Sequence, residues 1–314
     1  MLLSIVFSFR NEESNIPELV KRVSAACVAI DDLSYELIFV NDASTDNSLE
    51  ILMRLRTQFP ICIVNMSRKF GVAHCCLAGF AQARGDALIY MDSDLQDPPE
   101  IIPEMVKKYR EGADVVHTTR FVREGENPIK MWITKKAYQI INYFSEIPLP
   151  KNTGDFKLLS ARVYKEVLAL NEYDPYMRGL SVWVGFKQDF IIYKREPRYS
   201  GDAKFPLFSG GPIKEFIRGL TAYSAAPLYI SFFMGLTVSL IAGLLILWSL
   251  LIKFLGLASP GASGIMIATA FFSGIILMTN GIMGIYIAKI YYEVKGRPRY
   301  IVESMHPAPS SSSD

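Results

Sequence analysis

The stretch Ala87-Leu-Ile-Tyr-Met-Asp92-Ser-Asp94-Leu-Gln96-Asp97-Pro98-Pro99-Glu100 decides the fold. Its first residues form an apolar run without alternation, which is typical of a strand buried on both faces of a parallel sheet. Open α/β sheets bind ligands just beyond the carboxyl ends of such strands, so Asp92 and Asp94 are predicted to face a ligand. Their hard oxygen atoms favour Mg²⁺ or Mn²⁺. An ion held there could bind the diphosphate of a nucleotide, as a sugar-nucleotide transferase requires.

Strand and helix patterns alternate on both sides of this stretch. This alternation predicts an α/β fold, a Rossmann-like parallel sheet in three layers. The loop after the first strand lacks G-x-G-x-x-G, which argues against a dinucleotide fold. The expected strands are 2–9, 35–40, 61–66, 87–91 and 114–119, and the expected helices are 16–30, 48–58, 72–84 and 99–110.

Residues 120–210 are less regular and rich in Arg, Lys, Tyr and Pro. Within them, 151–156 and 199–205 are expected to be ordered loops that could complete an acceptor site.

Composition excludes several classes of protein. The net charge of +2 is too small for a nucleic-acid binder. The four cysteines have no C-x-x-C spacing and the three histidines are scattered, so neither a zinc site nor a disulfide framework is expected.

The last third of the chain is strongly apolar. Residues 228–252 and 265–288 are each long enough to span a bilayer, which needs about 20 apolar residues. Two buried helices of a soluble core are the alternative. Lysines and arginines flank the pair on both outer sides, so the positive-inside bias places the large domain and the tail in the cytoplasm.

The segment before the first apolar helix is amphipathic. Ile213, Phe216, Ile217 and Leu220 share one helical side, as in a helix that lies on a membrane surface. A solvated connector explains the pattern equally well. The predicted organisation is a cytoplasmic domain (1–210), an interfacial helix (211–227), a two-span hairpin (228–288) and a cytoplasmic tail (289–314).

Two further acidic strand ends are predicted at the same edge as Asp92. Asp42 could accept the N3–H of a uracil base, and Glu12 could hold the base or the ribose. A helix N-cap is the ordinary alternative for each such motif. Among the cations, Arg120 follows a strand end and is the favoured ligand of a lipid phosphate.

The order of motifs identifies a family resemblance. The motifs are N-E-E, N-D-A-S-T-D, R-K-F-G, M-D-S-D-L-Q-D-P-P-E, T-G-D-F, M-R-G-L, W-V-G-F and G-D-A-K-F, then two apolar spans and R-P-R-Y. The chain resembles the polyprenyl-phosphate glycosyltransferases of the GT-A, family 2 type. These include bactoprenol glucosyltransferases, undecaprenyl-phosphate aminoarabinose transferases and, more distantly, dolichol-phosphate mannose synthases.

The resemblance implies roles for individual residues. Asp92, Asp94 and Gln96 would hold Mg²⁺ or Mn²⁺ with the donor diphosphate. Asp155 would lie near the reacting centre, so that Asp94, Asp155 and Asp92 form the catalytic set. Asp42 and Glu12 would contact the nucleoside, and the expected ligands of the lipid phosphate are Arg120, Lys136, Arg198 and Lys204.

The implied reaction is an inverting transfer of a sugar to a polyprenyl phosphate at the cytoplasmic face of the inner membrane. UDP-glucose and undecaprenyl phosphate are the favoured substrates. UDP-linked amino sugars, a UDP-aminoarabinose derivative and GDP-mannose are the alternative donors. The product would serve cell-surface glycan modification, with a flippase and a downstream transferase as partners and a homo-oligomer as the assembly.

Two rival functions are considered. A processive polysaccharide synthase would need Q-x-x-R-W and more spans, which this sequence lacks. A non-catalytic lipid-binding or scaffold subunit would not need an intact D-x-D with Gln96 and Asp155.

Overall fold

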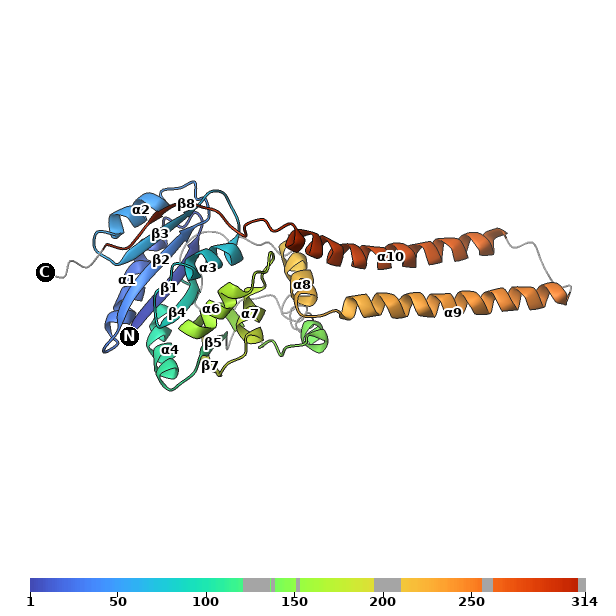
Figure 1. Cartoon of the computed structure of the whole chain (residues 1–314), viewed down its shortest axis with the longest axis horizontal. Coiled ribbons are helices and arrows are strands. Elements are labelled where there is room, and N and C mark those ends of the chain that lie inside the picture. Colours follow the sequence, from blue (N-terminus) through green and yellow to red (C-terminus); the bar gives the residue numbers. More distant parts are fainter. Residues whose placement is uncertain (121–135, 137–138, 151–152, 195–209, 256–261, 310–314) are drawn as a thin grey trace. The chain divides into compact units, whose positions relative to one another are not determined.

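The computed structural model describes residues 1–120, 136, 139–150, 153–194, 210–255 and 262–309. The chain forms two compact units (Figure 1). One comprises Met1–Gly219 together with Pro298–Asp314, and the other comprises Leu220–Arg297.

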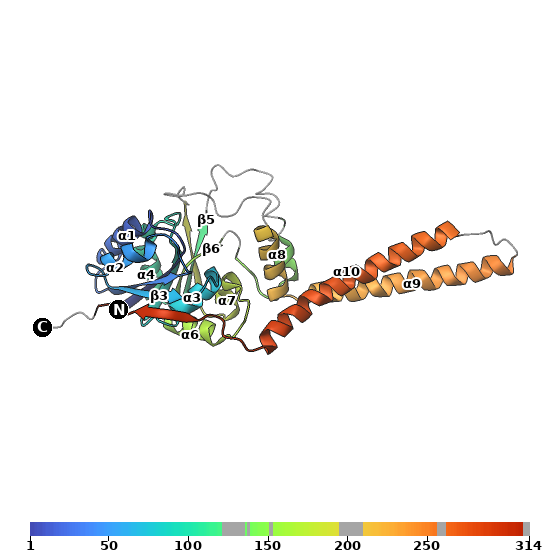
Figure 2. The same ribbon diagram turned by 90° about the horizontal axis from the view of Figure 1, so that it is seen from above.

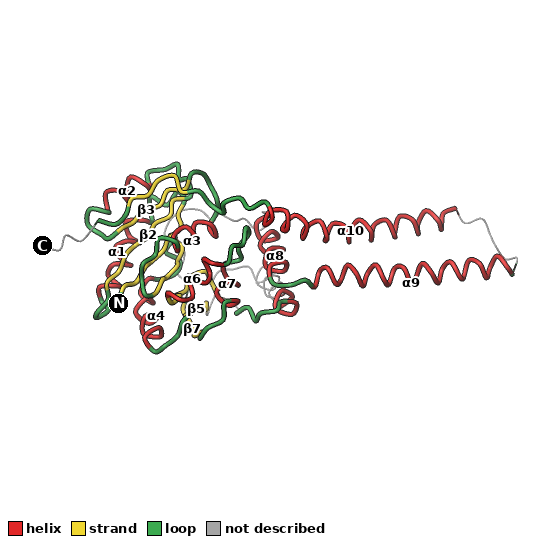
Figure 3. Tube along the Cα trace, viewed as in Figure 1, coloured by secondary structure: helices red, strands yellow, loops and turns green. Residues whose placement is uncertain are grey.

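A sheet with the strand order β7-β5-β6-β4-β1-β2-β3-β8 forms the centre of the larger unit. Its middle strands β4, β1, β2 and β3 are mutually parallel, and each is joined to the next in sequence through a helix (Figure 3). The strands are β1 (Leu2–Phe9), β2 (Ser34–Asn41), β3 (Ile61–Met66), β4 (Ala87–Asp92), β5 (Val115–Arg120), β6 (Thr153–Ser160), β7 (Gln188–Tyr193) and β8 (Val302–His306).

Helices cover both faces of the sheet (Figure 2). One face carries α1 (Ile16–Val28), α2 (Ser48–Leu55) and α4 (Ile102–Arg110), which follows the short 3₁₀ turn η1 (Pro99–Ile101). The opposite face carries α3 (Val72–Phe80), α6 (Ala161–Ala169) and α7 (Met177–Trp183). Because β1, β2 and β4 are buried on both faces, their apolar runs do not alternate.

The predicted α/β fold is confirmed, with a difference at the edges of the sheet. Strands β6 and β8 run antiparallel to their neighbours, so parallel pairing is confined to β1–β4 and to the β5–β7 pair. The predicted loop over 151–156 is wrong from Thr153 onward, where β6 begins. The alternate residues Phe156 and Leu158 are fully buried, so this strand is held by the core that they enter.

The smaller unit contains two long apolar helices, α9 (Ala226–Phe254) and α10 (Ala262–Val294), preceded by α8 (Gly210–Ala222). Ala226–Trp248 and Phe271–Val294 are long and apolar enough to cross a membrane. Of the most apolar 18-residue stretch in each helix, 6% and 0% of the residues are buried, which disfavours the alternative of two helices inside a soluble core. Helix α8 is amphipathic as predicted, and its Arg218 forms an ion pair with Asp174 at 2.9 Å.

The segment after α10 returns to the larger unit. Strand β8 pairs antiparallel with β3, and the Ser67 amide donates to the Ile301 carbonyl at 3.0 Å. Arg299 donates to the carbonyls of Leu168 and Leu170 at 3.3 and 2.9 Å, at the C-terminal end of helix α6. Of the tail predicted over 289–314, the first residues to Val294 belong to α10, and Val302–His306 form a strand of the sheet.

Candidate active site

The carboxyl ends of β4, β1 and β2 meet at one edge of the sheet. Ser8 of β1 lies opposite Asp92 of β4, and Phe9 lies opposite Asn41 of β2. This register brings the loops that carry Glu12, Asp42 and Asp94 to the same edge. The prediction of three acidic strand ends at one edge therefore holds in the structure.

The loop after β4 alternates between buried and half-buried residues. Ser93, Leu95 and Asp97 are at most 4% exposed, whereas Asp92, Asp94 and Gln96 are only partly buried. The Ser93 hydroxyl donates to the Ser8 carbonyl at 3.1 Å, and the Tyr193 hydroxyl donates to the Asp97 carboxylate. Asp94 Oδ1 accepts a hydrogen bond from the backbone N–H of Gln96 at 3.2 Å. The buried residues thus anchor the loop, while the three predicted metal ligands remain accessible.

Two buried hydroxyls lie beneath Asp92. The Tyr90 hydroxyl is 3.0 Å from the Ser8 hydroxyl and donates to Asp92 Oδ1 at 3.4 Å. Tyr90 is 2% exposed, and burial, followed by Cys76, Asp92 and Asp155, raises its pKa. The phenol therefore stays protonated and keeps a hydrogen to donate.

The loops after β1 and β2 are tied together. Thr45 N–H donates to Asn11 Oδ1 at 2.8 Å, and Asn11 N–H donates to the Ser44 hydroxyl at 3.1 Å. Glu12 N–H donates to the Ser48 hydroxyl at 2.9 Å, while its carboxylate accepts from the Asn15 side chain at 2.5 Å. The motifs N-E-E and N-D-A-S-T-D therefore form one interlocked surface.

Asp42 is 6% exposed and supports the loop before α3. Its carboxylate accepts from the amides of Phe70 at 2.6 Å and of Gly71 at 3.1 Å. Gly71 has φ of +93°, a conformation that favours glycine. A carboxylate offers about four lone-pair positions, so Asp42 retains acceptor capacity beyond these two bonds.

Asp155 forms a two-pronged ion pair with Arg178. Arg178 Nε donates to Asp155 Oδ1 at 3.1 Å and Nη2 donates to Oδ2 at 2.9 Å. The Arg178 side chain is 38% exposed and the Asp155 side chain is 21% exposed. Such paired charge-assisted bonds fix orientation as well as distance. The carboxylate predicted near the reacting centre is thus held by a guanidinium on α7.

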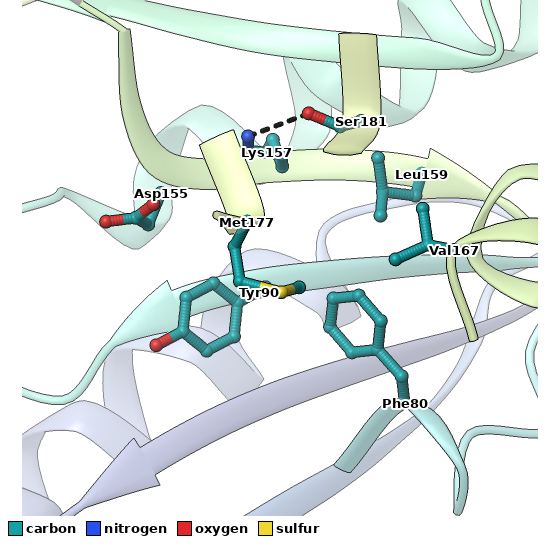
Figure 4. A pocket seen from close by; sticks show the side chains of 8 residues that line it. All are labelled: Phe80, Tyr90, Asp155, Lys157, Leu159, Val167, Met177 and Ser181. Atoms are coloured by element: carbon teal, nitrogen blue, oxygen red, sulfur yellow. Dashed lines mark hydrogen bonds between the residues drawn. The ribbon is translucent and has the colours of Figure 1, made fainter. Parts of the chain in front are cut away.

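Lys157 lies on the same strand as Asp155 but is 5% exposed. Its ammonium donates to the Ser181 hydroxyl at 3.0 Å (Figure 4). Burial chiefly, and Arg178 in addition, lower the pKa of Lys157 to about 8, while Asp155 acts in the opposite direction. A small cavity beside it is lined by Phe80, Tyr90, Asp155, Lys157, Leu159, Val167, Met177 and Ser181.

Of the four residues predicted to bind the lipid phosphate, two lie within the described part of the chain and two do not. Arg120 is the last residue of β5, and Lys136 is exposed. Arg198 and Lys204 lie outside the described residues. Their phosphate-binding role stays a prediction.

The donor set at the edge fits a divalent cation. Mg²⁺ in proteins is commonly held by one or two carboxylates and completed by substrate phosphates and water. Asp92, Asp94 and Gln96 supply two carboxylates and an amide oxygen on an accessible loop. Within the described ranges no three Asp, Glu, His or Cys side chains form a cluster that could hold a metal ion. The oxygen atoms of Asp92, Asp94 and Gln96 therefore suit an ion whose remaining ligands come from a bound diphosphate and water.

Sequence reasoning missed Tyr90 and Lys157 as members of this site. Tyr90 lies in a strand whose neighbours read as core, and Lys157 directly follows the segment 151–156, which was expected to be a loop. The available signal is a polar side chain at an inward position two residues from a predicted site carboxylate: Tyr90 beside Asp92, and Lys157 beside Asp155.

Comparison with known proteins gives consistent findings. The profile of Glycosyl transferase family 2 matches residues 4–168. An uncharacterized glycosyltransferase of Synechocystis sp. is 38% identical over 309 residues, covering 96% of this chain and 95% of that protein. A bactoprenol glucosyl transferase of Shigella phage SfII is 33% identical over 310 residues, covering 98% and 99%. A prophage bactoprenol glucosyl transferase homolog of Escherichia coli K12 is 33% identical over 306 residues, covering 96% and 99%.

Among solved structures, glucosyl-3-phosphoglycerate synthase from Mycobacterium tuberculosis, crystallised with Mn²⁺, UDP and glucosyl-3-phosphoglycerate, is 19% identical. The match covers 70% of this chain and 79% of that one, with a TM-score of 0.49.

Proposed function

Because this chain belongs to glycosyl transferase family 2, we propose that it transfers glucose from UDP-glucose to undecaprenyl phosphate at the cytoplasmic face of the membrane. The observation that carries the proposal is the extent of similarity to bactoprenol glucosyl transferases, which reaches 98% of this chain. That similarity extends beyond the domain matched by the family profile and includes the two apolar helices.

The acceptor chemistry agrees with the residues at the sheet edge. A phosphate is already an anion at neutral pH, so its oxygen can attack the sugar C1 without a strong general base. The ion pair between Asp155 and Arg178 is compatible with a reaction that needs no general base, because this carboxylate is paired with a cation. In-line attack inverts the anomeric carbon.

The leaving nucleoside diphosphate is the demanding part of the reaction. Asp92, Asp94 and Gln96 are the residues that would hold Mg²⁺ or Mn²⁺, which neutralises charge on a departing diphosphate when bound. Asp42 and Glu12, on the interlocked loops, are proposed to contact the nucleoside. Arg120 and Lys136 are proposed for the lipid phosphate, together with Arg198 and Lys204.

Membrane attachment would place the acceptor phosphate near the active site. The two apolar helices are proposed to span the inner membrane, with the amphipathic α8 at its surface. Holding the reactants in place in this way lowers the entropic part of the barrier.

A donor screen tests the proposal. The purified protein in detergent, with undecaprenyl phosphate and Mn²⁺ or Mg²⁺, is offered UDP-glucose, UDP-linked amino sugars, a UDP-aminoarabinose derivative and GDP-mannose. We expect lipid-dependent release of UDP from UDP-glucose, and Asp94→Asn should abolish it. Release from another donor would replace the sugar in the proposal. If no donor reacted with lipid and both metals present, the proposed transfer would be wrong.

A further inference from the structure

Lys157 is a buried cation that the proposed reaction does not use. Its side chain is 5% exposed, and its ammonium donates to a neutral acceptor, the hydroxyl of Ser181, at 3.0 Å. Burying an ammonium is costly unless nearby negative charge compensates it. The position of Lys157 in the sheet indicates which charge that is.

The strand register places Lys157 of β6 opposite Tyr90 of β4, and each of these residues is two positions from a site carboxylate on its own strand. This is the last residue pair of the β4–β6 ladder, and side chains two residues apart on a strand share a face, so Asp92 and Asp155 lie just beyond it on the same faces as Tyr90 and Lys157. Both carboxylates contribute to raising the pKa of Tyr90, after burial and Cys76, which agrees with this placement. Figure 4 shows Lys157, Asp155 and Tyr90 around one cavity.

Two carboxylates that both act on the Tyr90 hydroxyl from adjacent strands repel each other. Cations on the β6 side offset this repulsion. Arg178 pairs with Asp155 at 2.9 Å, and Ser181, one helical turn further along α7, binds Lys157. Strand β6 and helix α7 are thus joined twice, by residues two apart on the strand and three apart on the helix.

We propose that Lys157 is a positioning residue of the active site, whose buried charge compensates Asp155 so that this carboxylate can stand across from the metal-binding Asp92. The proposal rests on the assignment of Asp92 to a divalent cation in the proposed function. It assigns no contact between Lys157 and either substrate. Lys157 acts on the electrostatic potential of the site and on the position of α7 against β6.

The test measures Mn²⁺ binding by electron paramagnetic resonance, in the presence of UDP, on the full-length protein. Lys157→Met keeps an apolar side chain of similar length and removes the charge, so Mn²⁺ should bind roughly threefold to tenfold more tightly. Asp155→Asn removes the opposite charge and should weaken Mn²⁺ binding. The double variant should return toward the wild-type affinity. The exposed Lys107→Met is the matched control and should leave the affinity unchanged.

Turnover and unfolding separate positioning from a structural role. Lys157→Met should lower kcat with little change in the KM for the donor, while its unfolding temperature equals or exceeds that of the wild type. Unchanged Mn²⁺ affinity in folded Lys157→Met, or parallel loss of stability and activity, would overturn the proposal, as would absence of Mn²⁺ binding to the wild type. If the wild type transferred no sugar but bound Mn²⁺, the proposed function would fail while these affinities still decided the role of Lys157.

Discussion

At the residue scale, the Arg178–Asp155 pair depends on the planar geometry of the guanidinium. Lysine would keep the charge but lose the parallel bonds to the two carboxylate oxygens. Since Asp155 is proposed to lie near the reacting centre, where small displacements can be that costly, we expect Arg178→Lys to lower kcat about 100-fold. The measurement is steady-state release of the nucleotide at saturating donor.

Arg162→Lys is the matched control for that variant. Arg162 also donates two bonds to a carboxylate, that of Asp114, but on α6 and away from the site edge. Its substitution should leave turnover within twofold of the wild type. Equal losses in the two variants would show that Arg178 acts only through general stability.

The lowered pKa of Lys157 predicts how stability depends on pH. Burial and Arg178 bring the pKa to about 8, against 10.5 ordinarily, while Asp155 and Cys76 oppose the shift. Between these values the unfolded chain binds more protons than the folded chain, so rising pH favours folding at this residue. The cost of the buried charge is therefore fully present below pH 8 and fades above it.

The measurement compares the Tm of the wild type and of Lys157→Met at pH 7 and pH 9.5. The variant's advantage should be largest at pH 7 and should shrink at pH 9.5. The neighbouring His117 does not interfere, because burial, and Lys157 in addition, lower its pKa to about 3 and keep it neutral in this range. A constant difference in Tm across this range would contradict the prediction.

At the element scale, helix α3 lies very close to the sheet. A Cβ on Gly79 would come within 2.3 Å of Val6 Cγ1 and 3.1 Å of Val40 Cγ2. Gly79→Ala should therefore destabilise the protein by about 1–3 kcal/mol, since overpacking a filled core forces strands or side chains to move. Thermal unfolding in detergent measures the effect. Gly235→Ala has open space around its new methyl group and should not lower the Tm.

The elements predicted from sequence are those whose determinants are local. Unbroken apolar runs identified β1 and β3 with their observed bounds, and apolar stripes located α1 and α4 to within a few residues. Strand β6 was not predicted, and its first residues were expected to be part of a loop over 151–156. The burial of Phe156, the Arg178–Asp155 ion pair and the hydrogen bond from Lys157 to Ser181 explain a strand there. Strand β8 was missed because its short sequence gains order from pairing with β3.

The site followed the same division. The shared edge that carries Asp92, Asp94, Asp42 and Glu12 follows from the parallel direction of β1, β2 and β4, which the alternation of strand and helix patterns predicts. The contacts beneath and beside it come from segments distant in sequence: the Tyr90–Ser8 contact needs the register of β1 against β4, and the Arg178–Asp155 pair needs α7 packed on β6. No local spacing encodes that register.

At the scale of the whole molecule, strand β8 covers the outer side of β3 and forms one edge of the sheet. Asn65 of β3 donates to the Ser304 hydroxyl at 2.9 Å and accepts from Asn41 at 3.1 Å. Truncation after Arg297 would leave unpaired the backbone groups of β3 that face away from β2, and a longer exposed edge promotes association. We expect a lower Tm and aggregates on size-exclusion chromatography. Truncation after Pro309 keeps β8 and is the control; equal behaviour of the two would contradict this role.

The return of the chain to its starting unit also determines whether the number of bilayer crossings is even or odd. Met1–Gly219 and Pro298–Asp314 build one sheet-centred unit, so the polypeptide that leaves it at residue 220 comes back to the same compartment by residue 298. The number of bilayer crossings between these points must therefore be even. A reporter fused to either terminus should give the same compartment. A topology with a single crossing would require β8 to leave β3.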